Sequence, residues 1–197
     1  NSNVTAFKRD DYIDDFSTRF VSDSINGKFA GLFMGAEPVT GSFGFENGNS
    51  FAEISSNDAG AFLQAAGLIK RGADGKLDLR INRNADGING RLFTEGLKIY
   101  DLPALAKLLQ SLSIIGLLEQ MLGQGLFLAE SDINFRLDDE QYIIDSASFF
   151  GPSLGISLDG YLNRRDRLLD FQGVFSPIYA INSIGSVLTR KGEGLIG

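Results

Sequence analysis

The side chains of this 197-residue chain that could carry out acid–base chemistry are its carboxylates, lysines and tyrosines, because the sequence contains no histidine and no cysteine. Acidic residues stand side by side at Asp10 and Asp11, at Asp14 and Asp15, and at residues 138–140. A glycosidase needs two carboxylates that face each other across a cleft, whereas adjacent carboxylates in a turn are usually solvated. We therefore expect no enzymatic activity, and a carbohydrate-active enzyme is the less favoured alternative.

A second pattern that could bind a ligand, at residues 82–87, resembles the start of an EF-hand calcium loop. Such a loop ends on a bidentate glutamate, but this chain has Phe93 at that position, and Glu95 lies two residues later. A hairpin turn at residues 84–87 is the better prediction. Without histidine or cysteine, thiol nucleophiles, Ser-His-Asp triads and histidine-based metal sites are excluded. We expect no metal and no cofactor.

The composition is typical of a folded chain with a sizeable core, since 43% of the residues are apolar. The formal net charge of -7 argues against nucleic acid or an anionic membrane surface as an electrostatic partner. The 24 glycines and only four prolines indicate many tight turns, as in a protein rich in β-sheet.

Alternation of apolar and polar residues predicts two antiparallel meanders, at residues 75–99 and 126–175. A break is expected at Gly96 within the first meander, and polar turns at residues 138–140 and 163–166 divide the second. Residues 1–54 read as a glycine-rich β-strand segment of the same sheet. A short helix is expected near residues 58–67, where polar residues that can cap a helix precede an apolar run.

The most apolar stretch, residues 102–122, is predicted to form a helical hairpin inserted between the two meanders. Asp101 and Pro103 favour a helix start, and leucines follow at helical spacing. A membrane span needs about 20 predominantly apolar residues, but Lys107 and Glu119 bracket a much shorter apolar segment. The expected fold is therefore α+β, a curved antiparallel sheet with this hairpin. The hairpin either covers the sheet as core or presents an apolar surface to lipid.

Several segments, in order, carry a resemblance to a known family. They are SSNDAGAFLQAAGL, RGADGKLDLRI, the DLPALAKLL and GLLEQMLGQGL blocks, FFGPSLGISLDGYLN and the closing IGSVLTRKGEGLIG. In this order, residues 55–197 resemble the C-terminal domain of the AsmA-like family, close to its YhdP branch. The resemblance departs at Ser183 and Ile184, where the family usually carries a proline before the first glycine of the closing segment. Because the chain ends abruptly at Ile196 and Gly197, we expect a fragment of a longer protein.

The resemblance implies a non-enzymatic bacterial envelope protein that extends through the periplasm. In the AsmA, TamB and YhdP proteins, an inner-membrane helix outside such a fragment provides the anchor, and a long curved sheet is thought to carry phospholipid acyl chains in an apolar groove. The implied role is intermembrane phospholipid transport or outer-membrane homeostasis. The alternative is a structural module that caps the groove or docks an envelope partner. The candidate lipid-binding residues are Ile133, Phe135, Leu137, Leu154, Ile156, Leu158, Leu108 and Leu112.

Overall fold

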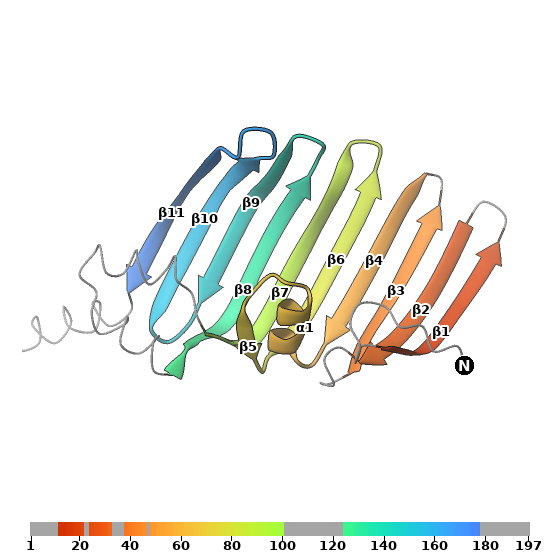
Figure 1. Ribbon diagram of the computed structural model, residues 1–197, viewed down its shortest axis with the longest axis horizontal. Helices are drawn as coiled ribbons and strands as arrows, with labels where there is room; N and C mark the ends of the chain where they lie inside the picture. Colours follow the sequence, from red (N-terminus) through yellow and green to blue (C-terminus); the bar gives the residue numbers. More distant parts are fainter. Residues whose placement is uncertain (1–11, 22–23, 33–37, 47, 101–123, 178–197) are drawn as a thin grey trace, which may run out of the picture.

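The structure, a computed structural model, describes residues 12–21, 24–32, 38–46, 48–100 and 124–177. The predicted helical hairpin at residues 102–122 lies outside these ranges, and Leu108 and Leu112 lie outside them with it. The described part of the chain forms one curved antiparallel sheet, not closed on itself, with one short helix (Figure 1).

The sheet is a meander in which almost every strand pairs with its neighbours in the sequence. Ten strands follow one another in the order β1-β2-β3-β4-β6-β7-β8-β9-β10-β11, and the short β5 pairs with β7. The elements are β1 Tyr12–Val21, β2 Ser24–Leu32, β3 Pro38–Glu46, β4 Asn49–Ser56, α1 Ala59–Ala65, β5 Arg71–Ala73, β6 Lys76–Asn84, β7 Gly87–Tyr100, β8 Leu126–Leu137, β9 Gln141–Phe150, β10 Leu154–Asn163 and β11 Leu169–Pro177.

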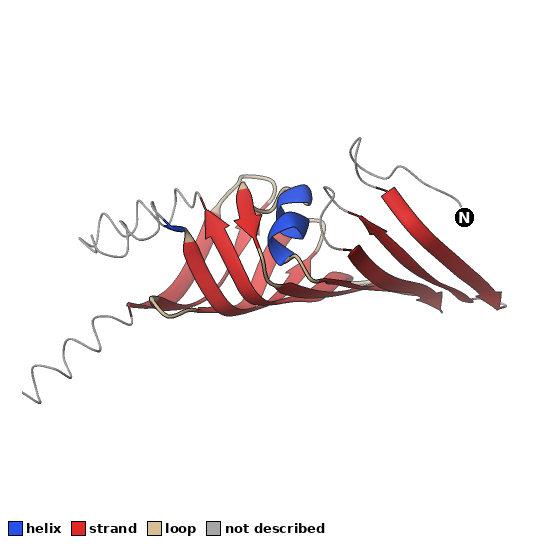
Figure 2. Ribbon diagram, turned by 90° about the horizontal axis from the view of Figure 1, so that it is seen from below, coloured by secondary structure: helices blue, strands red, loops and turns tan. Residues whose placement is uncertain are grey.

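The helix α1 begins where the sequence predicts it. The Asp58 side chain caps the helix, because its Oδ1 accepts a hydrogen bond of 2.9 Å from the Ala61 amide. The helix lies directly on β5, and Gly60 contacts Ala73 so closely that a Cβ atom at Gly60 would overlap the backbone of Ala73. Figure 2 shows that α1 lies on the side toward which the sheet curves.

The predicted break at Gly96 is a sharp change in the path of β7. Glu95 is the last residue of β7 that pairs with β6, and Lys98 is the first that pairs with β5. Gly96 adopts a φ of 71°, which glycine tolerates and other residues rarely adopt. Thr94 and Leu97 are three residues apart and would point to opposite faces of a regular strand. Because both are buried, the alternation of inward and outward side chains shifts at this point.

A closed hydrophobic core lies at the end of the strands where α1 and β5 pack on the sheet. Phe62 and Leu63 of α1 belong to one buried cluster with residues from five strands. Those strand residues are Val39, Leu77, Leu97, Ile99, Leu126, Leu128 and Leu154.

The coarse fold prediction is confirmed: the described chain is mostly curved antiparallel sheet with a short helix near residues 58–67. Residues 1–54 are predicted as a β-strand segment of the same sheet, but β1 and β4 are not predicted as individual strands. Within the described ranges, no helix has the length and hydropathy that a membrane span requires.

Candidate functional site

The face of the sheet that carries α1 presents rows of apolar side chains that cross the nine consecutive strands from β2 to β11, and the pairing register of these rows continues into β1. Residues paired in register on neighbouring antiparallel strands point to the same face. We call one such series of partners the central row, and it contains no polar residue. The central row is Phe16, Phe29, Gly41, Ile54, Leu79, Leu92, Ile133, Ala147, Leu158 and Gly173.

A second row, further from α1, is apolar in every strand except β1, where it begins with Thr18. We call it the outer row. Its members are Thr18, Gly27, Phe43, Ala52, Ile81, Gly90, Phe135, Ile144, Gly160 and Phe171. The central and outer rows, together with the apolar residues that flank them on the same side of the sheet, form what we call the apolar face.

The apolar face is covered at one end, and elsewhere no described element covers it. Near α1, Leu77 and Leu154 are 1% and 0% exposed. In the central and outer rows, Leu79, Ile133 and Leu158 are only partly buried. Beyond the outer row, Phe45 is 44% exposed and Leu169 is 61% exposed. The described core therefore closes only part of an apolar surface that is much larger.

Five of the eight candidate lipid-binding residues come together on this face. Ile133, Phe135 and Leu137 lie on β8, and Ile156 and Leu158 lie on β10. The pairing register places both groups on the same face of the sheet, with β9 between the two strands. Leu154 differs from them, because it lies inside the closed core with no exposed surface. Leu108 and Leu112 lie outside the described residues.

On the apolar face, three phenylalanine rings lie over glycines of the neighbouring strand. The ring of Phe135 occupies the space that a Cβ atom at Gly90 would need, and Phe29 stands in the same relation to Gly41. Phe171 fills the corresponding space at Gly160. Since glycine has no side chain, each ring lies down on the backbone, and the apolar face stays shallow where the rings lie.

The N-terminal strands and β11 contribute residues to the apolar face that sequence reasoning does not single out. Phe29, Phe43 and Phe45 come from β2 and β3, and Leu169 and Phe171 come from β11. The alternation of glycine with phenylalanine in GSFGF, at residues 41–45, is the signal that could have identified Phe43 and Phe45.

The opposite face of the sheet is mainly polar, although Phe51, Phe127 and Phe150 are exposed on it, and ion pairs cross it between neighbouring strands. Arg91 donates from Nε and Nη2 to the two carboxylate oxygens of Asp132, both at 2.7 Å. Arg136 makes the same kind of contact with Asp145. The hydrogen bond from its arginine lowers the pKa of each aspartate below its usual value. These contacts occupy both carboxylates at neutral pH.

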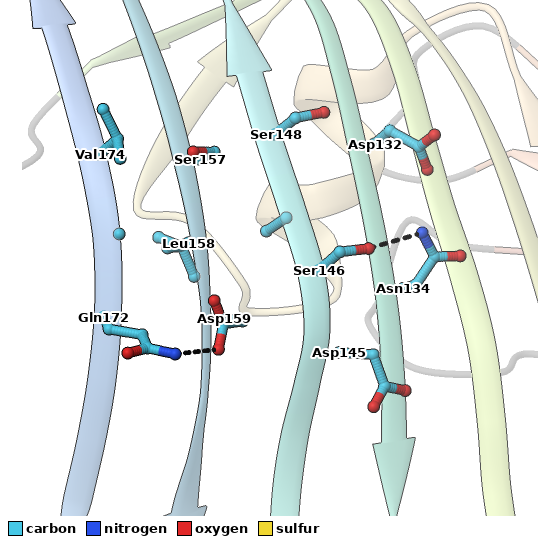
Figure 3. Close-up of a pocket in the computed structure, with 12 residues that line it drawn as sticks. Asp132, Asn134, Asp145, Ser146, Ser148, Ser157, Leu158, Asp159, Gln172 and Val174 are labelled. Atoms are coloured by element: carbon cyan, nitrogen blue, oxygen red, sulfur yellow. Dashed lines mark hydrogen bonds between the residues drawn. The ribbon is translucent and has the colours of Figure 1, made fainter.

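A shallow depression of about 530 Å³ lies on this polar face, over β8 to β11 (Figure 3). It is lined mainly by hydroxyl, amide and carboxylate groups, among them Ser148, Ser157 and Asp159. The Gln172 amide donates a hydrogen bond of 2.9 Å to Asp159. The aspartates that line the depression thus have side-chain partners of their own.

The acidic pattern at residues 138–140 and the calcium-like pattern form turns, whereas Asp14 and Asp15 lie in the strand β1. Asp138 Oδ1 accepts from the amides of Glu140 and Gln141, which closes the turn between β8 and β9. The predicted hairpin at residues 84–87 is confirmed, with Asn84 paired to Gly87. Within the described residues, no group of three or more acidic side chains is placed to hold a metal ion.

Comparison with known proteins finds no matching family model, no matching curated protein and no matching solved structure.

Proposed function

We propose that this chain is a non-enzymatic lipid-handling segment of an AsmA-like envelope protein, and that its apolar face contacts the acyl chains of phospholipid. One observation carries the proposal: the central row crosses the nine strands from β2 to β11 without a polar residue, yet the described core closes only one end of the face. Contiguous exposed apolar surface on a folded protein indicates a binding surface.

The residue types on the apolar face suit an acyl chain better than a polar ligand. Aliphatic side chains offer non-directional contacts, and each methylene of a lipid that leaves water contributes about 0.8 kcal/mol. The rings that lie flat over Gly41, Gly90 and Gly160 keep the surface shallow. A lipid chain could therefore shift along the rows without breaking specific bonds, as transport requires.

The wider role in this proposal follows the family resemblance. The full-length protein is held at the inner membrane by a segment outside this chain and works in the periplasm, in phospholipid transport between membranes or outer-membrane homeostasis. The helical hairpin proposed for residues 102–122 is then a cover for part of the apolar face or an additional lipid contact.

Photo-crosslinking at two matched phenylalanines tests the contact with lipid. Phe135 of β8 lies on the apolar face, whereas Phe93 of β7 lies on the polar face in register with Asp132. Each is replaced in turn by p-benzoyl-L-phenylalanine, and the chain is irradiated in bacteria or with phospholipid vesicles. We expect lipid adducts by mass spectrometry from position 135 and few from position 93. Equal labelling at both positions, or none at 135, would overturn the proposal.

Lipid that copurifies with the unmodified chain provides a second readout. The alternative proposal, a module that docks an envelope partner through the helices at residues 102–122, is separated by replacing Leu108 and Leu112 with aspartate. Loss of a partner with the bound phospholipid unchanged favours the docking module. Loss of the bound phospholipid at an unchanged Tm favours lipid contact.

A further inference from the structure

The two edges of the sheet differ in how well they are protected against pairing with another strand. Exposed sheet edges are templates for further strands, and proteins commonly protect them with charges or bulges. The sequence of β1 carries three charged residues, and its register with β2 shifts between Ile13 and Asp15. Its charged residues are Asp14, Asp15 and Arg19.

The other edge, β11, has little of this protection. It pairs with β10 over nine consecutive residues without a bulge, and Asp170 is its only charged residue. Val174 is 63% exposed, and Phe171 and Leu169 are also exposed on this strand. No strand among the described residues pairs with the outer side of β11. Within the described residues, this edge is regular, largely apolar and unpaired on its outer side.

We propose that β11 pairs antiparallel with β11 of a second copy of this chain, with the twofold axis at Gly173. A symmetric dimer requires an edge that is complementary to itself. The axis at Gly173 pairs all nine residues of β11, and it sets Phe171 opposite Phe175 and Asp170 opposite Ser176. An axis at Asp170 would instead bring the two carboxylates together, which is unfavourable for directly opposed residues.

This pairing places the apolar side of β11 in one copy beside the apolar side of β11 in the other. Leu169, Phe171 and Phe175 lie on the apolar side of β11, and Gln172 and Val174 lie on the polar side. In the proposed register, Phe171 meets Phe175 on the apolar side, and the two apolar faces become one surface. That last consequence rests on the proposed lipid function, whereas the pairing itself does not.

The mass of the chain in solution tests the pairing. We expect light scattering to give twice the 21.3 kDa of one chain. Val174→Asp places a carboxylate diagonal to Asp170 of the second copy, so this variant is expected to be monomeric. Leu68→Asp is the control, because Leu68 is 66% exposed but lies outside β11. A monomeric wild type, or a dimer that survives Val174→Asp, would overturn the proposal.

Disulfide formation tests the register, since the chain contains no cysteine of its own. Gln172 and Val174 are opposite each other across the proposed axis. We expect a mixture of Gln172→Cys and Val174→Cys chains to form a crosslinked dimer faster than either variant alone. Faster crosslinking of Gln172→Cys with itself would contradict the axis at Gly173. Both outcomes are independent of lipid, so a failed dimer and a failed lipid proposal are distinguishable.

Discussion

The covered end of the apolar face and its uncovered rows are built from the same residue types, yet they differ in burial. Leu154 and Leu158 lie on one strand and point to one face, but Leu154 is fully buried and Leu158 is only partly so. The difference comes from α1 and β5, whose residues close the core at one end of the sheet. Apolar alternation in a strand therefore identifies a face, while a distant element decides which part of it becomes core.

The largest expected effect is a difference in the free energy of unfolding between substitutions of these two leucines. Leu154→Ala removes a fully buried side chain from a closed cluster and should lower the free energy of unfolding by about 2–5 kcal/mol. Leu158→Ala removes a partly exposed side chain and should cost about 1 kcal/mol. Urea denaturation of both variants measures the difference. Equal costs would mean that the outer part of the face is as closed as the end near α1.

A pair of glycines tests whether α1 closes the core by close contact. An alanine at Gly60 would place its Cβ against the backbone of Ala73, so Gly60→Ala should destabilise the chain by about 1–3 kcal/mol. Gly155 in β10 has no atom within 4 Å of such a Cβ, and Gly155→Ala should change little. The Tm of each variant provides the measurement. If Gly60→Ala is as stable as Gly155→Ala, then the contact between α1 and β5 is looser than the structure indicates.

The sequence predicts the strands most accurately where alternation is uninterrupted. Residues 126–137 and 141–150 coincide with β8 and β9, because polar residues mark the turn at Asp138. The strand β4 is not predicted, since Phe51 and Ala52 are adjacent apolar residues that point to opposite faces. In β1, adjacent Asp14 and Asp15 resemble a solvated turn rather than a strand.

The sequence predicts which face of the sheet carries the candidate site, but not which part of that face stays uncovered. Alternation places Ile133, Phe135 and Leu158 on one side of the sheet, and the register confirms this placement. Alternation cannot separate Leu154 from Leu158, because the cover over Leu154 depends on contacts with distant elements. The contact of Phe135 with Gly90 likewise depends on how β7 and β8 align, which the local sequence does not encode.

A smaller effect should come from the cap that starts α1. Asp58→Ala leaves the Ala61 amide without its side-chain partner and should cost about 1 kcal/mol. Asn57→Ala is the matched control, because Asn57 is the exposed neighbour that precedes the cap. Hydrogen exchange of the α1 amides should rise in the first variant only. A rise in both variants would show that the turn before α1, rather than the cap, holds the helix in place.

The smallest expected effect concerns the polar face and depends on pH. Because Arg91 lowers the pKa of Asp132 in the folded state, the ion pair adds stability above the usual pKa of about 3.9 and loses it as the pH falls through the folded value. Asp132→Asn should therefore lower the Tm slightly at pH 7, and the gap to the wild type should close in strong acid. Exposed ion pairs contribute little, so the gap should stay well below that of Leu154→Ala. A gap as large at pH 2 as at pH 7 would assign the effect to packing around Asp132 and not to its charge.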